Sequence, residues 1–367
     1  MRLKKGPPDY VLFISIFALL GIGLVMVFSA SSVLSGLDYD DAYYYIKKQL
    51  QWAAVGLIAM ILAMKFNYNK LRVLGWPLLI ITLVCLVLVF TPLGIEVNGA
   101  RRWIGIEPYI RVAPAEIAKI TLILFLAKYL EANIKNIRSF SKGLAPVLLY
   151  TAIICGLILL EKDLGTSFTL AGSVFLMMHV SGARFSHLFF LLSSGLVLVA
   201  GAVYIAPYRL NRVLAFIDPW KYPLDIGYQT IQSLYALGSG GLFGLGLGQS
   251  KQKYFYLPEE HTDFIFAILG EELGFFGVAV VLLLFILIAW RGYKAALNAP
   301  DIFGNLLAAG ITTVIIFQAA INIGVVAGCL PVTGITLPFV SYGGSSLVFS
   351  LIGIGLLLNV SRHSTNH

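Results

Sequence analysis

The chain has 367 residues, of which 59% are hydrophobic and only 12% are charged. Soluble domains carry about 25% charged residues, so the composition excludes an ordinary soluble domain and predicts a membrane protein with several spans. The net charge of +8 does not call for a nucleic-acid partner, and none is expected, because lysines and arginines also hold loops on the cytoplasmic side of a membrane. The three cysteines lie in separate apolar runs, so they predict neither a metal site nor a disulfide framework.

Ten apolar runs follow one another along the chain, and each is long enough to predict a transmembrane helix. They fall at roughly 10–34, 50–66, 74–91, 113–130, 143–161, 164–182, 187–206, 263–290, 303–329 and 345–360. The first run is longer than the apolar core of a signal peptide and is interpreted as a retained span. The sequence therefore predicts an all-α, polytopic membrane bundle of ten transmembrane helices. This bundle forms one domain over residues 1–367, with a long loop at about 207–262 between spans seven and eight.

Basic residues are concentrated in alternate loops, which predicts that both the N-terminus and the C-terminus are cytoplasmic. Acidic residues show the opposite bias, since only Asp9, Glu131 and Asp301 fall on the predicted inner side. The positive-inside rule does not account for that bias, so it indicates a polar site on the outer face. The segments expected to meet there are 35–49, 92–112, 162–163, 207–262 and 331–344.

Two groups of charged residues near the fourth span each allow two interpretations. Glu116 and Lys119 are three residues apart and share a helix face. They form either an ion pair that fixes helix packing or a lysine that meets an anionic group. Arg101 and Arg102 precede Trp103. They are either interfacial anchors or forked donors that bind phosphate oxygens.

Three features lie at the predicted outer ends of spans five to eight. Asp163 occupies a short turn, where it is either a helix cap or an acid of the site. Arg209 and Arg212 follow span seven, and a short amphipathic helix near 227–237 is expected on the membrane surface. The glycines between 238 and 248 match no phosphate-binding pattern and are interpreted as a flexible loop.

Three acids lie near the start of the eighth span. Charges within a membrane are costly and rare. Asp263 lies at the polar boundary and is the best candidate for a general base, whereas Glu271 and Glu272 are expected to buttress the bundle. His261 is the alternative base, although a loop histidine is more commonly solvated.

The ninth span and the stretch that follows it carry further polar groups. Gln318 and Asn322 share a helix face and are expected to form interhelical hydrogen bonds. The stretch around Ser341 contains prolines and glycines and predicts non-helical backbone at membrane depth. Such backbone is tolerated only within protein or against a wet cavity.

The chain resembles the SEDS family, the cell-division, elongation and sporulation proteins FtsW, RodA and SpoVE. The resemblance covers nearly the whole chain and rests on RRWIG, PAEIAK, DLGT, HTDFIF and NIGVVAGCLPVTGITLPFVSYGGSS. The segments GLGQSKQKYFYLPE and LLNVSR are more similar to the FtsW and SpoVE branch. Two departures occur: Ala113 and Ala115 replace the Gln and Ser of the family's QPSE motif, and Lys162 replaces the Pro of PDLGT.

The resemblance implies a peptidoglycan glycosyltransferase that polymerises lipid II at the outer face of the bacterial cytoplasmic membrane. It implies ten spans, an essential Asp263, and a class B penicillin-binding protein, a transpeptidase, as partner. Asp263 is expected to deprotonate the acceptor sugar in an inverting transfer from which undecaprenyl diphosphate leaves. The predicted substrate-binding residues are Arg101, Arg102, Glu116, Lys119, Asp163, Arg209 and Ser341. The candidate cofactor is a divalent cation, Mg²⁺ or Mn²⁺, which the sequence does not specify.

Two alternative functions remain at this point. One is a flippase for the same lipid, because intramembrane charges also occur in transporters. The other is a non-enzymatic scaffold that recruits its transpeptidase.

Overall fold

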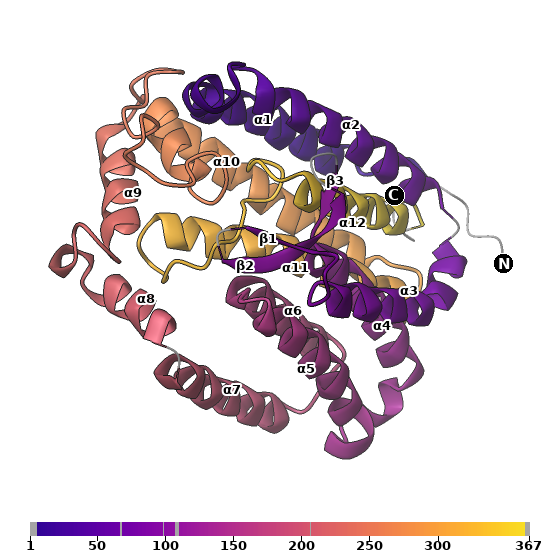
Figure 1. Ribbon diagram of the computed structural model, residues 1–367. Helices are drawn as coiled ribbons and strands as arrows, with labels where there is room; N and C mark the ends of the chain where they lie inside the picture. The colour runs from indigo at the N-terminus through magenta and orange to yellow at the C-terminus, as the bar shows by residue number, and fades with distance from the viewer. Residues whose placement is uncertain (1–5, 67, 98, 107–109, 206, 364–367) are drawn as a thin grey trace.

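The computed structural model describes residues 6–66, 68–97, 99–106, 110–205 and 207–363. Figure 1 shows a bundle of long helices, with α7 and α8 at its margin. The long helices are α1 (Tyr10–Tyr39), α2 (Tyr44–Lys65), α3 (Tyr68–Leu88), α4 (Pro114–Ala132), α5 (Ala145–Leu160), α6 (Leu164–Val180), α7 (Phe185–Ile205), α10 (Ile265–Leu297), α11 (Ile302–Val326) and α12 (Gly344–Arg362). The short ones are α8 (Pro207–Ile217), α9 (Tyr228–Ser239), η1 (Ile134–Asn136), η2 (Phe140–Leu144) and η3 (Pro219–Lys221).

Seven helical segments of the described chain are long and apolar enough to cross a membrane. They comprise α1, α2, most of α3, α5 together with η2, α10, α11 and α12. The helices α4, α6 and α7 coincide with the other three predicted runs. However, α4 carries two lysines and two glutamates, and the apolar parts of α6 and α7 are shorter. The chain is therefore a multi-pass membrane protein, and the number of ten spans stays a prediction.

A small antiparallel sheet lies between α3 and α4, in a segment for which the sequence analysis predicted no strand. Its strands are β1 (Gly94–Val97), β2 (Ala100–Ile106) and β3 (Ile110–Val112), in the order β1-β2-β3. Val97 pairs with Ala100, so β1 and β2 are joined by the dipeptide Asn98–Gly99. Asn-Gly is the strongest short hairpin signal, and Gly99 has the positive φ of 73° that such a turn requires.

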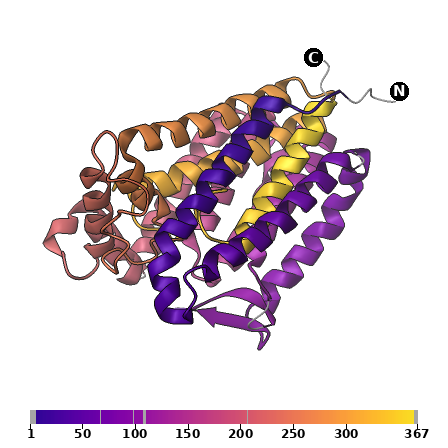
Figure 2. The same cartoon turned by 90° about the horizontal axis from the view of Figure 1, so that it is seen from above.

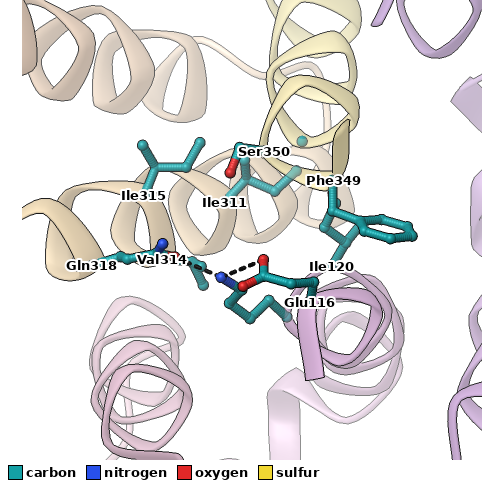
Figure 3. Close-up of a pocket in the computed structure, with 10 residues that line it drawn as sticks. Glu116, Ile120, Ile311, Val314, Ile315, Gln318, Phe349 and Ser350 are labelled. Atoms are coloured by element: carbon teal, nitrogen blue, oxygen red, sulfur yellow. Dashed lines mark hydrogen bonds and ion pairs between the residues drawn. The ribbon is translucent and has the colours of Figure 1, made fainter. Parts of the chain in front are cut away.

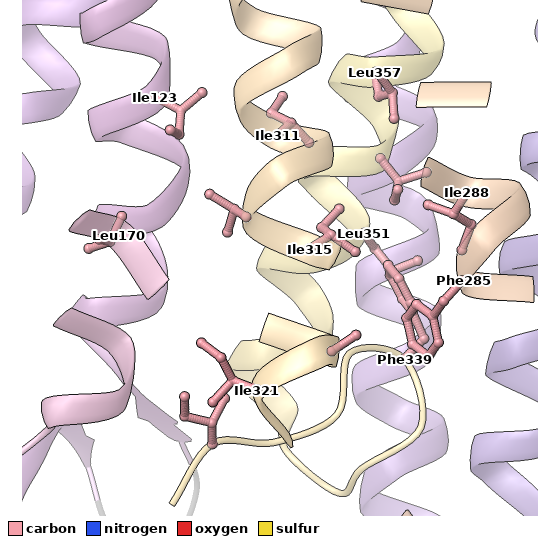
Figure 4. Packing of buried hydrophobic residues seen from close by; sticks show 14 of the residues in the cluster. Ile123, Leu170, Phe285, Ile288, Ile311, Ile315, Ile321, Phe339, Leu351 and Leu357 are labelled. Carbon is pink, nitrogen blue, oxygen red and sulfur yellow. The ribbon is translucent and has the colours of Figure 1, made fainter. Parts of the chain in front are cut away.

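Among the seven segments long and apolar enough to cross a membrane, α11 and α12 are the most deeply buried, and both contribute to the apolar core. Figure 4 shows Ile311 and Ile315 of α11 beside Leu351 of α12, with Phe339 and Phe285 close to them. Figure 2 shows the long helices running alongside one another, with both termini at the same end of the bundle. The long loop between α7 and α10 lies at the opposite end, which we call the loop end.

The glycine-rich segment 240–248 is ordered by a break in α10, so the prediction of a flexible loop is wrong. Gly274 lies inside α10 with φ 64° and ψ −163°, outside the helical range. The amides of Phe275 and Phe276 donate to the carbonyls of Gly241 and Leu242 at 2.9 and 3.2 Å. Backbone groups released by the break are thus satisfied by the loop.

The amphipathic helix predicted near 227–237 is confirmed as α9, but it does not lie freely on a membrane surface. Ile231 is buried, and the Ser233 hydroxyl donates to the carbonyl of Val326 at 2.7 Å. Tyr235 remains half exposed. The predicted apolar face of this helix therefore packs largely on α10 and α11.

We expect Gly244→Ala to destabilise the protein. A Cβ at Gly244 would lie 2.1 Å from the carbonyl oxygen of Glu272, and its φ of 80° is unfavourable for alanine. Gly238→Ala is the matched control, because no atom lies within 4 Å of its Cβ position. The thermal unfolding midpoint in detergent should fall for Gly244→Ala and stay unchanged or rise for Gly238→Ala. Equal midpoints would contradict the docking of this loop.

Candidate active site

Asp263 lies at the loop end, just before the first residue of α10. The predicted span therefore begins two residues later than expected, at Ile265. Burial, together with the negative charge of Glu259, raises the pKa of Asp263 from 3.8 to about 7, and the charge of Arg102 opposes this rise. A carboxylate with a pKa near neutrality is well suited to accept a proton during catalysis.

The backbone around Asp263 is held by the non-helical segment 331–343, whose irregular conformation confirms the prediction for this stretch. The Ser341 hydroxyl donates to the carbonyl of Thr262 and accepts from the amide of Leu337, at 2.7 and 2.8 Å. Gly334 has φ 71°, and a Cβ at this position would lie 3.5 Å from a carboxylate oxygen of Asp263. Ser341 thus supports the segment that carries Asp263.

Two amides of α11 connect this segment to the bundle: Gln318 forms the predicted interhelical hydrogen bond, whereas the bonds of Asn322 go to non-helical backbone. The Asn322 side chain donates to the carbonyls of Asp263 and Ile335 at 2.7 and 2.6 Å. One turn away, Gln318 donates to the carbonyl of Thr336 at 2.9 Å. Its oxygen accepts from the Lys119 ammonium at 2.6 Å. These hydrogen bonds, joined through the neighbouring residues Ile335 and Thr336, connect α4 to the backbone of Asp263.

Glu116 and Lys119 form the predicted ion pair, with 2.6 Å between the charged atoms. Both side chains line a cavity of about 20 Å³ that also borders Gln318 and Ser350 (Figure 3). That volume is room for about one water molecule. The Lys119 ammonium is buried and shared between Glu116 and Gln318, so its evident role is to hold α4 against α11.

The sheet contacts the turn between α5 and α6 through Arg102. Its guanidinium donates to the carbonyls of Glu161 and Lys162 at 3.3 and 2.6 Å. The Lys162 ammonium donates back to the carbonyl of Gly99 at 2.9 Å. Arg101 instead pairs with the exposed Glu96 at 3.0 Å. Arg102 therefore fixes a turn, and Arg101 keeps an exposed guanidinium.

The turn itself carries Asp163, which caps α6 as one of its two interpretations predicted. Its carboxylate accepts from the amide and the hydroxyl of Thr166 at 2.9 and 2.8 Å. Asp163 also raises the pKa of Asp263, which places it within the electrostatic field of the site. Lys162 has φ 61°, a value that proline cannot adopt. A proline at position 162, as in the PDLGT motif, would therefore not fit the backbone conformation of this turn.

Glu161 is a residue of this region that the sequence analysis missed. Both of its carboxylate oxygens are buried without a hydrogen-bond partner among the described residues. Burial and the neighbouring charge of Asp163 raise its pKa to about 8, opposed by Arg102. Its only sequence signal is its position two residues before Asp163, at the end of an apolar run.

Arg209 and His261 are the remaining predicted features of the loop end. Arg209 lies in α8, but its side chain falls outside the described part of the structure, whereas Arg212 donates to the carbonyl of Val332 at 3.0 Å. His261 is buried against the rings of Tyr45 and Tyr342, so the expectation that this loop histidine is solvated is wrong, and burial lowers its pKa. Within the described ranges, no three His, Cys, Asp or Glu side chains are grouped to bind a metal ion.

The fold and the site define a multi-pass helical membrane protein with a polar site at the loop end. The family model described as "Cell cycle protein", FtsW/RodA/SpoVE, matches residues 10–366. The chain belongs to this family.

Individual relatives are similar over almost their whole length. Stage V sporulation protein E of Bacillus subtilis (strain 168) is 49% identical, over 99% of this chain and 100% of the relative. A probable peptidoglycan glycosyltransferase FtsW of Trichlorobacter lovleyi is 43% identical, over 96% and 93%.

Two solved structures have a similar fold. One is described as "Structural coordination of polymerization and crosslinking by a peptidoglycan synthase complex"; a chain of it matches with a TM-score of 0.81 and 34% identity, over 98% of this chain and 99% of that one. The other is the rod shape determining protein RodA of Thermus thermophilus, with a TM-score of 0.72 and 31% identity, over 98% of each chain.

Proposed function

We propose that this chain is a peptidoglycan glycosyltransferase that polymerises lipid II at the outer face of the bacterial cytoplasmic membrane. Family membership and the relatives named as probable peptidoglycan glycosyltransferases support this activity. The observation that carries the proposal is Asp263, a carboxylate with a pKa of about 7 at the loop end of an apolar bundle. In the proposed reaction, a lipid-linked substrate approaches this end of the bundle while its tail stays in the bilayer.

Asp263 acts as the general base in the proposed reaction. It accepts the proton of the acceptor sugar hydroxyl while that oxygen attacks the anomeric carbon of the donor. The new glycosidic C–O bond forms as the bond to the diphosphate oxygen breaks, so the configuration inverts and undecaprenyl diphosphate leaves with the bonding electrons. General-base assistance of this kind contributes about 10²–10⁴ in rate.

The leaving diphosphate requires positive charge where its own negative charge grows. Arg102 and Arg212 both act on the Asp263 carboxyl electrostatically, which supports their presence near the reacting groups. Arg101 offers an exposed guanidinium on the same sheet. Glu116 and Lys119 contribute by holding α4 and α11 in place, and Asp163 by fixing the start of α6.

A class B penicillin-binding protein is the proposed partner. One solved relative belongs to a peptidoglycan synthase complex that coordinates polymerization and crosslinking. The same fold in this chain supports an equivalent association with a transpeptidase.

The decisive experiment uses the purified full chain with labelled lipid II in detergent, followed by a gel that resolves glycan chains. Detergent removes the two sides of the membrane. A glycosyltransferase should therefore yield chains, whereas a flippase or a scaffold should yield none. Absence of chains from folded protein, with and without a partner transpeptidase, would refute the proposal.

Asn322→Ala should lower kcat by about 10–100-fold with little change in KM, because small misplacements of a catalytic group are costly. The variant removes two hydrogen bonds that hold the segment of Asp263. Asn305→Ala is the control. Asn305 lies on the same helix and donates to the carbonyl of Ala296 at 3.0 Å, but far from the loop end. Equal activity of the two variants in the lipid II assay would show that Asn322 does not position Asp263.

A further inference from the structure

A second pocket lies at the end of the bundle that carries both termini, far from Asp263 along α10. Its volume is about 320 Å³, and it is lined by the segment that precedes α1, the last turns of α10, and Ser361 of α12. Next to these lining residues, the Gly6 amide donates to the Arg362 carbonyl at 2.8 Å and joins the segment before α1 to the end of α12. Figure 2 shows the start of α1 and the end of α12 at this end of the bundle. The proposed polymerisation makes no use of this pocket.

Three polar residues of the lining come from a single face of α10. Arg291, Lys294 and Asn298 are spaced by three and four residues and therefore project from the same side of the helix. Arg291 is paired with Asp9, at 2.6 Å between nitrogen and oxygen. The Lys294 side chain is exposed and forms no ion pair among the residues that the structure describes. The pocket thus carries one unmatched positive charge.

Apolar surface continues from the pocket along both helices that flank it. On α1, Tyr10, Ile14 and Phe17 are exposed and share one face. On α10, the exposed residues on one face include Trp290 and Ile286. In a membrane protein these stripes face acyl chains, and aromatic residues such as Tyr10 and Trp290 are typical of the boundary between headgroups and hydrocarbon. A polar pocket at the end of two apolar stripes matches the shape of an amphiphile.

We propose that this pocket binds the phosphate of an anionic phospholipid headgroup, with Lys294 as its main cationic contact and the acyl chains lying on α1 and α10. A phosphodiester matches the net positive charge of the lining, and Asn298 of α10 and Ser361 of α12 also line the pocket. The volume exceeds that of a bare phosphate, which favours a whole headgroup. The site is independent of the proposed polymerisation. A lysine in the last turn of α10 also complements the helix dipole, but that role needs neither a pocket nor a lipid.

The test is native mass spectrometry of the full-length protein titrated with phosphatidylglycerol or with zwitterionic phosphatidylcholine. The first phosphatidylglycerol should bind more tightly than phosphatidylcholine. Lys294→Gln should weaken it by about fivefold, since a basic residue near a membrane surface contributes about 1 kcal/mol. Lys294→Arg should retain binding. The matched control is Lys142→Gln, an exposed lysine of η2 in another connection on the predicted inner side, which should leave the affinity unchanged.

Three results would overturn the proposal. The first is equal affinity of the two lipids, and the second is equal weakening by Lys294→Gln and Lys142→Gln. The third is an unfolding midpoint that Lys294→Gln lowers by the same amount in either lipid. In that case Lys294 would stabilise α10 through the helix dipole alone and would not bind the headgroup. Competition with inorganic phosphate or glycerol 3-phosphate shows whether the bound phosphate group comes from a lipid or from a soluble molecule. If either one displaces phosphatidylglycerol at millimolar concentration, the pocket binds a soluble phosphate. If neither does, the lipid assignment stands.

Discussion

Asp263→Asn is expected to abolish polymerisation of lipid II while the helical bundle stays folded. The amide keeps the size of the carboxylate but cannot accept the proton of the acceptor hydroxyl. The rate should fall by about 10²–10⁴ or below detection. The backbone carbonyl of Asp263 still accepts from Asn322, so the loop should keep its position. Glycan chains on a gel, with a matched amount of folded protein, provide the measurement.

The pH dependence tests the same residue independently. With a pKa of about 7, the Asp263 carboxyl is mainly protonated below neutrality, so wild-type activity should decrease as the pH falls from about 8 to about 6. Any activity left in Asp263→Asn should not show this decrease at acidic pH, which we call the acidic limb of the pH profile.

Stability should show the opposite trend. Because the folded pKa lies above 3.8, the folded state binds this proton more tightly than the unfolded state. The stability that this group contributes is therefore complete below 3.8 and is lost as the pH rises through about 7. Above pH 7 the unfolding midpoint of Asp263→Asn should be at least as high as that of the wild type.

Asp41→Asn is the control for charge alone. Asp41 lies in the connection between α1 and α2 and pairs with the exposed Lys47 at 2.8 Å. Its loss should leave the polymerisation rate and the acidic limb unchanged. A folded Asp263→Asn protein that polymerises at the wild-type rate would remove Asp263 from the role of base.

The features that the sequence predicted correctly are those set by local spacing. Apolar runs of sufficient length placed the long helices, and the three-residue spacing of Glu116 and Lys119 placed their ion pair. Asp163 before an apolar run predicted a helix cap that the structure contains. Prolines and glycines around 331–343 predicted irregular backbone. In each case neighbouring residues determine the structure.

The features that were missed depend on contacts between distant segments. Nothing near Arg102 in the sequence indicates that it binds the carbonyls of Glu161 and Lys162, about sixty residues away. The loop glycines lack an interpretable motif because their conformation depends on hydrogen bonds to α10 at its break near Gly274. The small sheet leaves no apolar periodicity in the sequence, although Asn98–Gly99 carries a hairpin signal. Prediction of the active site is therefore limited by tertiary contacts.

Glu272→Gln should cause the largest loss of stability. Glu272 is completely buried and pairs with the equally buried Lys253 at 3.1 Å. The Ser29 hydroxyl of α1 and the Ser250 amide of the loop also donate to it, at 2.7 and 3.2 Å. This confirms the predicted buttressing role, and the carboxylate joins α1, α10 and the loop that leads to Asp263.

Neutralising Glu272 leaves the Lys253 ammonium buried without a carboxylate, which typically costs about 3–5 kcal/mol. The unfolding midpoint in detergent should therefore fall by many degrees, and polymerisation should weaken as the loop loses its attachment. The double variant Glu272→Gln/Lys253→Met should recover part of the midpoint, because it removes the unpaired charge. Glu96→Gln is the control: its pair with Arg101 is half exposed and should contribute no more than about 1 kcal/mol. If Glu272→Gln unfolds at the same temperature as Glu96→Gln, the buried pair does not hold the loop to the bundle.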